Sequence, residues 1–318
     1  MFNGGRTIGR CLASVSRSAH PRRECIVVDD KSDDDTLAIA EAFDVRVIRS
    51  ERRRGAAHAR NLGAAAATGE ILLFLDADVE IYPDCLERVA GGFELNPEIS
   101  ALFGSYDDRP ACPNFLSQYK NLFHHFIHQA SRPDATTFWS ACGAVKRSAL
   151  STAGGFDENC RMMEDIELGQ ALVSRGLKIR LIKDLQVKHL KRYSFAGLLK
   201  SDFFDRAIPW TVLMLKNKRL ADDLNLQLEH KTSAAVLFLL LVMVVAAFRF
   251  PWLAIFVPVP LAAFFLLNRS FYSFFRNKRG ALFMLRTIPL HFLYYVYSTL
   301  GFGAGSLVYL SQKLRRGR

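Results

Sequence analysis

Two aspartates separated by one residue stand directly after a short apolar run. Asp76 and Asp78 follow residues 71–75, whose sequence I-L-L-F-L is typical of a buried strand. In an extended backbone, alternate residues point to the same side, so both carboxylates can face one divalent cation, Mn²⁺ or Mg²⁺. Such a cation stabilises the charge that develops on a departing diphosphate. A turn at a strand end also favours acids, so the D-x-D spacing alone does not decide between the two interpretations.

A second acidic pair ends another apolar run. Asp29 and Asp30 follow residues 25–28. Capping of the next helix explains the acids that come later in this segment. It does not explain two adjacent acids at the strand end, where a carboxylate of Asp30 can accept hydrogen bonds from a nucleobase. Arg60 lies in a predicted helix at 55–67, and its guanidinium either binds a diphosphate in a bidentate manner or remains a solvated surface charge.

A third acidic pair opens a predicted helix at 164–175. Glu164 and Asp165 suit the first turn, because carboxylates there complement the helix dipole. The alternative is a general base, which must lie near an acceptor hydroxyl and stay ionised until it takes the proton. His189 ends the run 185–188, and its neutral imidazole could complete a metal site. The histidines at 124, 125 and 128 lie among Phe and Ile and are predicted to pack in a helix.

The pattern of elements predicts where these side chains gather. Short apolar runs, each ended by Asp or Gly, alternate with helical segments, which indicates a mostly parallel sheet with helices on both faces. In such α/β sheets, ligands bind beyond the carboxyl ends of the strands, where the acids are found. The predicted strands are 25–28, 45–48, 71–75 and 178–182, and the predicted helices are 36–43, 55–67 and 164–175.

The C-terminal third has a different composition. Residues 232–248, 250–267 and 287–310 contain no Asp, Glu, Lys or Arg, and each approaches or exceeds the length of one bilayer crossing. Basic residues before the first segment and after the second predict that both flanks are cytoplasmic, so these two segments form a hairpin in the cell (inner) membrane. About three spans are therefore expected. With three crossings, the basic residues at 313–318 would lie outside, which conflicts with the same rule unless the Gly-rich third segment re-enters the membrane. Residues 194–215 mix large apolar and charged side chains, which predicts an interfacial segment.

Three domains are therefore expected: a catalytic part at 1–192 in the cytoplasm, an interfacial segment and linker at 193–231, and a multi-pass membrane part at 232–318. The formal net charge of +11 comes from dispersed Arg and Lys that flank the apolar segments, which favours a membrane as partner and argues against nucleic acid. Six cysteines without a C-x-x-C pair argue against a zinc site and fit a reducing compartment. Residues 1–23 lack the apolar core of a secretory signal.

Taken in order, these motifs resemble glycosyltransferase family 2, the inverting enzymes with a nucleotide-diphospho-sugar (GT-A) fold. The run V-V-D-D-K-S-D-D-D-T resembles the family's V-V-D-D-G-S-x-D-x-T, with Lys31 in place of the common Gly. G-A-A-H-A-R-N-L-G at 55–63 resembles G-x-x-x-A-R-N-x-G, and F-L-D-A-D at 74–78 resembles the metal segment. The G-G-F-D and E-D motifs that end at Asp157 and Asp165, with residues 138–145, resemble the acceptor region.

The resemblance covers roughly residues 3–190 and implies a role for each acid. It assigns Asp165 as the general base on the acceptor hydroxyl, with Glu164 supporting it. No Q-x-x-R-W element of processive synthases follows, so transfer of a single sugar to a lipid or glycan acceptor is favoured over polymerisation. In the donor site, the resemblance assigns Asp30 to the base, Arg60 to the nucleotide, Asp76 to the ribose or metal, and Asp78 to the cation. We further expect Asp29 to take part in nucleotide-sugar binding and His189 to complete the cation site.

The start of the chain departs from the family. Members begin with a buried strand V-x-V-I-I-P-x-Y-N, whereas M-F-N-G-G corresponds only to the end of that segment. Because this strand is internal to the sheet, we expect its absence to expose two strand edges. The expectation is a start codon upstream or a truncated gene. The alternative to an active enzyme is a catalytically inactive membrane scaffold.

Overall fold

The computed structural model divides into two compact units, Met1–Tyr193 and Ser194–Arg318, and each is described by itself. All of the predicted site residues lie in the first unit. The predicted linker at 193–231 overlaps residues 218–227, which lie outside the described residues. The structure describes residues 1–18, 20–160, 162–217 and 228–316.

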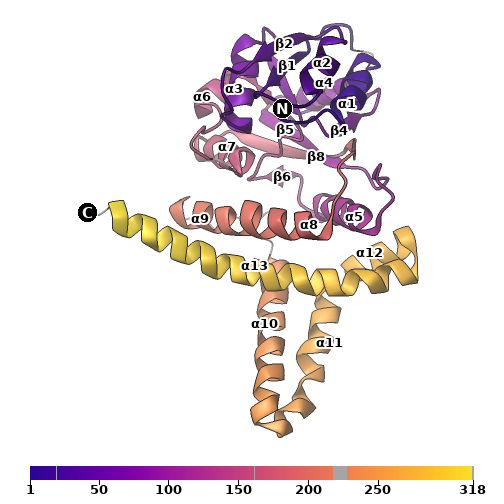
Figure 1. Ribbon diagram of the computed structural model, residues 1–318, viewed down its shortest axis with the longest axis vertical. Helices are drawn as coiled ribbons and strands as arrows, with labels where there is room; N and C mark the ends of the chain where they lie inside the picture. Colours follow the sequence, from indigo (N-terminus) through magenta and orange to yellow (C-terminus); the bar gives the residue numbers. More distant parts are fainter. Residues whose placement is uncertain (19, 161, 218–227, 317–318) are drawn as a thin grey trace. The chain divides into compact units, whose positions relative to one another are not determined.

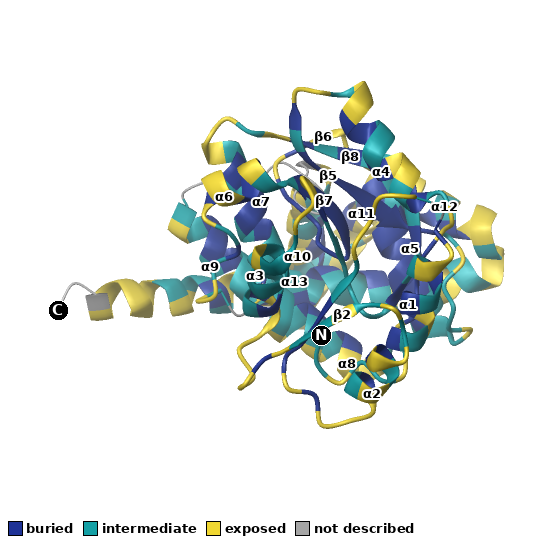
Figure 2. Ribbon diagram, turned by 90° about the horizontal axis from the view of Figure 1, so that it is seen from above, coloured by how far each residue is buried: buried dark blue, intermediate teal, exposed yellow. Residues whose placement is uncertain are grey.

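The first unit is an α/β domain in which helices cover the strands, and burial concentrates in the strands and the helix faces turned toward them (Figures 1 and 2). The strands are β1 (Ile26–Asp29), β2 (Arg46–Arg49), β3 (Ile71–Leu75), β4 (Val79–Ile81), β5 (Ile99–Tyr106), β6 (Asp134–Ala135), β7 (Cys142–Lys146) and β8 (Lys178–His189). The helices are α1 (Ile8–Ser16), α2 (Thr36–Glu41), α3 (Ala56–Ala66), α4 (Cys85–Leu95), α5 (Phe115–Ala130), α6 (Arg147–Ala153) and α7 (Glu164–Ser174).

The strands form two sheets, and the larger one is mixed. β1 and β2 pair in parallel, whereas the larger sheet has the order β3-β7-β5-β8-β4, with β6 paired to β8. Among the described strands of this sheet, β5 and β8 run parallel and the other pairs are antiparallel. The prediction of a mostly parallel sheet was wrong, because a strand that is buried on both faces reads as a continuous apolar run in either direction.

Met1 extends the pairing of the smaller sheet. Its amino group donates to the carbonyl oxygen of Val28 at 2.6 Å, and the amide of Asp30 donates to the carbonyl oxygen of Met1 at 2.7 Å. This is the bond pattern of two parallel strands, with Met1 opposite Asp29. Among the described strands, β1 pairs only with β2 and β3 only with β7.

Close backbone contacts hold the centre of the larger sheet. Gly104 on β5 has no side chain where β8 passes, and a Cβ added to it would lie 2.1 Å from the carbonyl oxygen of Leu185. Gly143 on β7 is similarly enclosed, because an added Cβ would lie 2.4 Å from the carbonyl oxygen of Trp139. Both glycines therefore permit the packing that brings β7 and β8 to the acids at the strand ends.

The second unit is helical. Figure 1 shows α10 and α11 side by side as a hairpin, with α13 crossing its open end. A π-helical turn, η1, precedes Pro209, which is the second residue of α9. The elements are α8 (Phe195–Asp202), η1 (Phe203–Ala207), α9 (Ile208–Asn217), α10 (Leu228–Arg249), η3 (Pro251–Phe256), α11 (Pro258–Leu267), α12 (Arg269–Arg279) and α13 (Ala281–Arg316).

One described helix is long and apolar enough to cross a membrane. It covers Glu229–Arg249 and contains the first predicted span. The second predicted span falls in Pro251–Leu267, which meets the same criterion only together with Arg269–Arg279, across a bend of 60°. The third predicted span lies within α13, which is not among the candidates in the described chain. Membrane association therefore has the support of one helix, or two if the bent pair counts as one span.

Candidate active site

Arg60 joins two acidic segments that lie far apart in the sequence. From α3, its guanidinium donates to Asp76 Oδ1 at 2.9 Å and to Glu164 Oε1 at 2.5 Å. The side chain of Arg60 is 15% exposed and that of Glu164 is 13% exposed, so this pair is largely removed from water. Burial alone would lower the pKa of Arg60, but Asp76, Glu164 and Asp165 raise it above its usual value. The guanidinium is therefore a permanent positive charge amid three carboxylates.

Asp78, the residue before β4, and His189, the last residue of β8, lie next to each other. Their strands pair antiparallel with Val79 opposite His189, and Asp78 Oδ2 lies 3.6 Å from His189 Nε2. Burial opposes ionisation of Asp78, but the hydrogen bond and charge of His189 outweigh it and lower the pKa of this carboxyl. Tyr106 stacks on the His189 ring at 4.1 Å and 15°, which fixes the orientation of the imidazole. The predicted metal residues are therefore neighbours.

Asp165 begins α7 beside β7. Its Oδ1 accepts the amide of Ile166 at 2.8 Å, and its Oδ2 accepts the amide of Ser140 at 3.3 Å and the hydroxyl at 3.4 Å. Burial and the neighbouring Glu164 raise the pKa of Asp165 to about 6, although Arg60 and the Ser140 amide act in the opposite direction. A carboxyl with this pKa is ionised at neutral pH but takes a proton readily, as a general base must.

The acids at the end of β1 hold loops in place. Asp29 is fully buried, and both of its carboxylate oxygens accept the amide of Ser32 at 3.2 Å. Asp30 is 3% exposed and accepts the amide of Arg54 at 2.9 Å and that of Gly55 at 2.7 Å. Both carboxylates thus bond to backbone amides, and Asp30 fixes the loop that leads into α3.

Residues near the family motifs add contacts that the sequence did not indicate. Asn61 donates to the carbonyl oxygen of Phe156 and accepts its amide, each at 2.9 Å, which ties α3 to the G-G-F-D loop. The close approach of Gly155 permits this, since an added Cβ would lie 2.9 Å from the Asn61 amide oxygen. Lys31, at the position where the family has Gly, adopts φ +63°. The family glycine was the only sequence signal for this left-handed residue.

The predicted helix histidines are buried, as expected. His124, His125 and His128 on α5 are 9%, 6% and 3% exposed. His125 Nδ1 lies 2.7 Å from the carbonyl oxygen of Tyr106, and the His124 ring packs edge-on against Tyr106 at 5.9 Å. This helix therefore supports the same tyrosine that stacks on His189.

The metal-binding capacity of the site is limited to a pair of side chains. Asp78 supplies an oxygen and His189 a nitrogen, which suits Mn²⁺ or Mg²⁺ poorly as a complete shell but well as part of one. Among the described residues, no group of three or more His, Cys, Asp or Glu side chains is arranged to hold a metal ion. The residues therefore fit a cation only if the donor diphosphate supplies further oxygen ligands.

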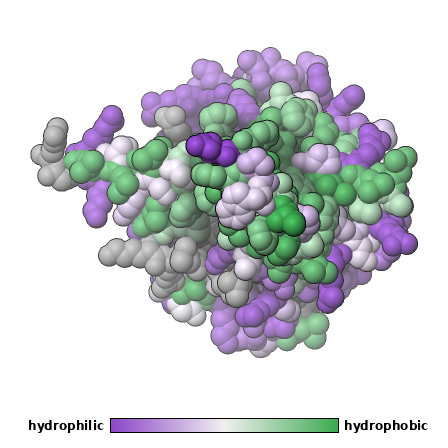
Figure 3. Space-filling model, turned by 90° about the horizontal axis from the view of Figure 1, so that it is seen from below, coloured by the Kyte–Doolittle hydropathy of each residue, from purple (hydrophilic) through white to green (hydrophobic). Residues whose placement is uncertain are grey.

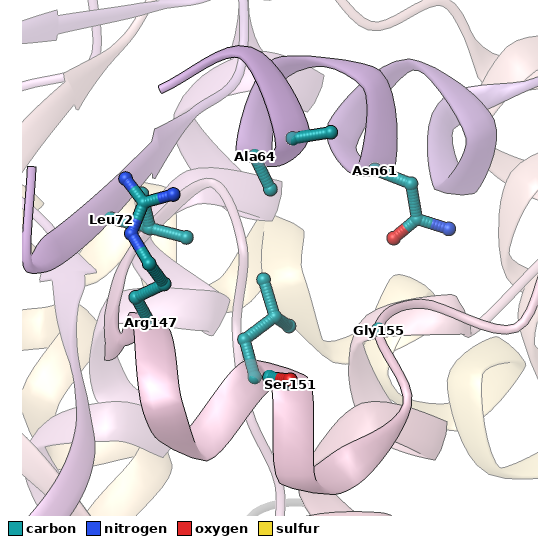
Figure 4. A pocket seen from close by; sticks show the side chains of 8 residues that line it. Asn61, Ala64, Leu72, Arg147, Ser151 and Gly155 are labelled. Carbon is teal, nitrogen blue, oxygen red and sulfur yellow. The ribbon is translucent and has the colours of Figure 1, made fainter. Parts of the chain in front are cut away.

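A separate pocket of about 220 Å³ is lined by residues of α3, β3 and α6. Figure 4 shows Ala64 and Leu72 along its wall, with Arg147 at one end. The Arg147 guanidinium is already bonded to the carbonyl oxygens of Ala67 and Gly69. None of the clustered acids lines this pocket, so we assign it no part in the chemistry.

Comparison with protein families agrees with this geometry. Residues 1–154 match the family model for glycosyl transferase family 2, and residues 134–298, more than half of the chain, match that for glycosyl transferase family 21. The chain belongs to the family 2 and family 21 glycosyltransferases. The family 2 match contains Arg60, Asp76 and Asp78, whereas the family 21 match contains Asp165 and His189. The cluster of this glycosyltransferase is thus assembled from both matched regions.

Curated relatives match parts of this glycosyltransferase. An uncharacterized glycosyltransferase of Haemophilus influenzae is 35% identical over 178 residues, which are 52% of this chain and 57% of the relative. Poly-beta-1,6-N-acetyl-D-glucosamine synthase of Staphylococcus epidermidis is 32% identical over 108 residues, 33% of this chain and 26% of the relative. The chain therefore spans little more than half the length of the first relative and less of the second.

Solved structures share the fold. The mannosyltransferase PcManGT from Pyrobaculum calidifontis, in complex with GDP-Man and Mn²⁺, has a TM-score of 0.59 and 20% identity, and the match covers 98% of this chain and 86% of that one. S. aureus TarS 1–349 in complex with UDP-GlcNAc has a TM-score of 0.50 and 20% identity, covering 68% and 64%. At these identities the likeness shows the GT-A-like fold.

Proposed function

We propose that this glycosyltransferase moves a single sugar from a nucleotide-diphosphate sugar to a lipid or other membrane-borne acceptor, with inversion at the anomeric carbon. The observation that carries the proposal is the arrangement around Arg60. This residue lies between the acid after β3 and the acids that open α7, with Asp78 and His189 close by in the same unit. The solved structures of the same fold hold GDP-Man with Mn²⁺ and UDP-GlcNAc.

In the proposed reaction, Asp165 takes the proton of the acceptor hydroxyl. The oxygen then forms a bond to the anomeric carbon while the bond from that carbon to the diphosphate breaks, and the electron pair leaves with the nucleotide diphosphate. Arg60 provides positive charge near the developing phosphate charge. Asp78 and His189 would hold a divalent cation, which when bound stabilises the leaving diphosphate as a Lewis acid.

Two protein ligands imply that cation and donor bind together. Since the described residues offer only the Asp78 and His189 pair, Mn²⁺ alone should bind weakly. Nucleotide diphosphate adds phosphate oxygens, so the apparent Mn²⁺ affinity should rise by about tenfold or more when the nucleotide is present. Isothermal titration of Mn²⁺ with and without the nucleotide measures this, and equal affinities would contradict the proposed metal site.

Features of the second unit support the proposed acceptor and the proposed membrane face. One apolar helix, Glu229–Arg249, supports membrane association. An enzyme held at a bilayer meets acceptors that are held there too, so a lipid-linked or other membrane-borne hydroxyl is the proposed acceptor. The basic flanks of the apolar segments support a cytoplasmic face for the first unit and a multi-pass location in the cell membrane.

The first experiment is hydrolysis and transfer by the detergent-purified full chain with a panel of nucleotide sugars and Mn²⁺ or Mg²⁺. Asp78→Ala should abolish metal stimulation, and Asp165→Asn should lower the rate by about 10²- to 10⁴-fold while nucleotide binding persists. Asp44→Asn, an exposed aspartate on the α2–β2 loop, is the matched control and should retain full activity. A wild-type chain that is folded but binds no nucleotide would instead support the inactive scaffold.

A further inference from the structure

Charge is divided unevenly along the chain. Of the 42 Lys and Arg residues, 31 lie at 1–230 together with all 31 Asp and Glu residues. Residues 231–318 carry the remaining 11 basic residues, and no acidic residue follows Glu229. The whole formal net charge of +11 therefore belongs to the last 88 residues, which also contain the apolar hairpin.

Helix α12 carries part of this charge. Its apolar side chains Phe271, Tyr272 and Phe275 are buried. They stack on α13, where the rings of Phe275 and Phe283 lie 6.0 Å apart at 8°. The exposed residues of α12 include Arg269, Arg276 and Lys278. Because the helix packs by its aromatic side chains, these three basic side chains lie on the part of its surface that remains exposed.

Exposed apolar side chains lie along the hairpin that leads to α12 and at the start of α13. The hairpin exposes Phe248 to 87%, Ile255 to 76% and Leu266 to 67%, and Figure 3 shows the apolar surface gathered over it. At the start of α13, Leu282 and Leu285 are 73% and 55% exposed. Apolar surface of this extent is unfavourable in water and marks a surface that binds an apolar partner.

The change from apolar to basic occurs at a bend. α11 ends at Leu267, α12 begins at Arg269, and the two helices meet at 60°. A helix that leaves the hydrocarbon layer and turns at the headgroup level would show this order, with its cations beside phosphates and its neighbouring leucines beside acyl chains. An acidic protein would satisfy the cations but would not match the exposed leucines and hairpin.

We propose that α12 and the first turns of α13 form a binding surface for anionic phospholipid headgroups. The surface consists of Arg269, Arg276, Lys278, Arg279 and Arg286. It is a property of the second unit alone and does not depend on the sugar-transfer reaction. A basic residue near an anionic bilayer contributes about fivefold to the preference for that bilayer, and this contribution falls as salt screens it.

The test counts the lipids that the full chain retains. The protein is reconstituted in vesicles of equal phosphatidylglycerol and phosphatidylcholine, extracted in mild detergent, and its bound lipids are measured by mass spectrometry. Wild type should retain phosphatidylglycerol in excess, and less so in 0.5 M NaCl. Replacing Arg269, Arg276 and Lys278 by Gln should reduce the ratio of the two lipids by at least tenfold. The control replaces three exposed basic residues of the first unit, Arg22, Arg175 and Lys178, by Gln.

The control should leave the lipid ratio unchanged, which separates a local surface from a general effect of net charge. If the triple α12 variant does not fold, Arg276→Gln alone should reduce the ratio by about fivefold. Equal retention of the two lipids by wild type would overturn the proposal, as would equal losses in the α12 and control variants. None of these outcomes involves a nucleotide sugar, so failure here leaves the proposed transfer activity untouched.

Discussion

Replacing Glu164 by Gln should extend sugar transfer to lower pH. Asp165 must be ionised to accept a proton, so in wild type the rate should fall as the pH drops through about 6, the pKa of this carboxyl. Burial is the largest cause of the raised pKa, and the negative charge of Glu164 is the next. The Gln side chain keeps the size of Glu164 but removes this charge, so it lowers the pKa of Asp165.

The magnitude follows from the charges that surround Asp165. A neighbouring like charge typically shifts a carboxyl pKa by about one unit or more. Glu164→Gln also releases part of the Arg60 charge, because the 2.5 Å bond from Arg60 to Glu164 loses its ionic partner. Both effects lower the pKa of Asp165. We therefore expect the acidic limb of the pH profile to move down by about one unit, which corresponds to about 1.4 kcal/mol.

The assay is kcat/KM for donor hydrolysis or transfer from pH 4.5 to 8.5 at saturating Mn²⁺. Glu158→Gln is the matched control, because Glu158 is a nearby acid that binds Arg54 and His58 instead of Arg60. This variant should keep the wild-type limb. An acidic limb that stays near pH 6 in Glu164→Gln, or moves upward, would refute the electrostatic reasoning. A limb that moves equally in the control would show that total charge, not the position of Glu164, sets it.

Three further predictions concern stability in the first unit, measured by native-state hydrogen exchange of the β7 amides. Arg60→Ala should lower the free energy of unfolding by about 2 to 3 kcal/mol, because it leaves two carboxylates without their counter-charge; an unchanged value would contradict the ion-pair geometry. Asp165→Asn should raise the free energy of unfolding by up to about 3 kcal/mol at pH 7.5. The raised pKa of Asp165 means that ionising this carboxyl destabilises the folded state; this destabilisation is absent below pH 3.8 and complete above pH 6. An equal gain in stability at pH 3.5 would argue against this cause. Gly104→Ala should lower the free energy of unfolding by about 3 kcal/mol or more, whereas Gly91→Ala, on α4 with open space around it, should raise it by up to about 1 kcal/mol.

The local elements of the first unit were predictable from the sequence. Strands expected at 25–28, 45–48 and 71–75 are found as β1, β2 and β3, within one residue at each end. Apolar runs bounded by Asp, Gly or Arg give these strands a strong local signal. Gly176 directly follows the predicted helix 164–175 and has φ +76°, a conformation that favours glycine.

The direction of a strand, and the burial of a helix against other helices, were not predictable from the sequence in the same way. The direction of β7 depends on its pairing with β3 and β5, and nothing in its own five residues encodes that choice. Likewise, α13 contains an uncharged stretch, yet Tyr295 and His291 within it are almost fully buried against other helices. A hydropathy scale scores each residue by its type alone. In the structure, the position of these residues depends on their polar partners, such as Asn268, whose side-chain oxygen accepts a hydrogen bond from the Tyr295 hydroxyl.

Arg60 shows that a sequence motif and the contacts in the structure give different information about one residue. The motif indicated that Arg60 matters but left open whether it binds a phosphate or faces solvent. Its partner Glu164 lies 104 residues further along the chain, and no periodicity links the two. In the structure the guanidinium neutralises Asp76 and Glu164, so a diphosphate that reaches Arg60 must compete with these carboxylates. Donor binding at Arg60 should therefore weaken at least one of the two ion pairs, which couples the nucleotide to Glu164 and so to the pKa of Asp165.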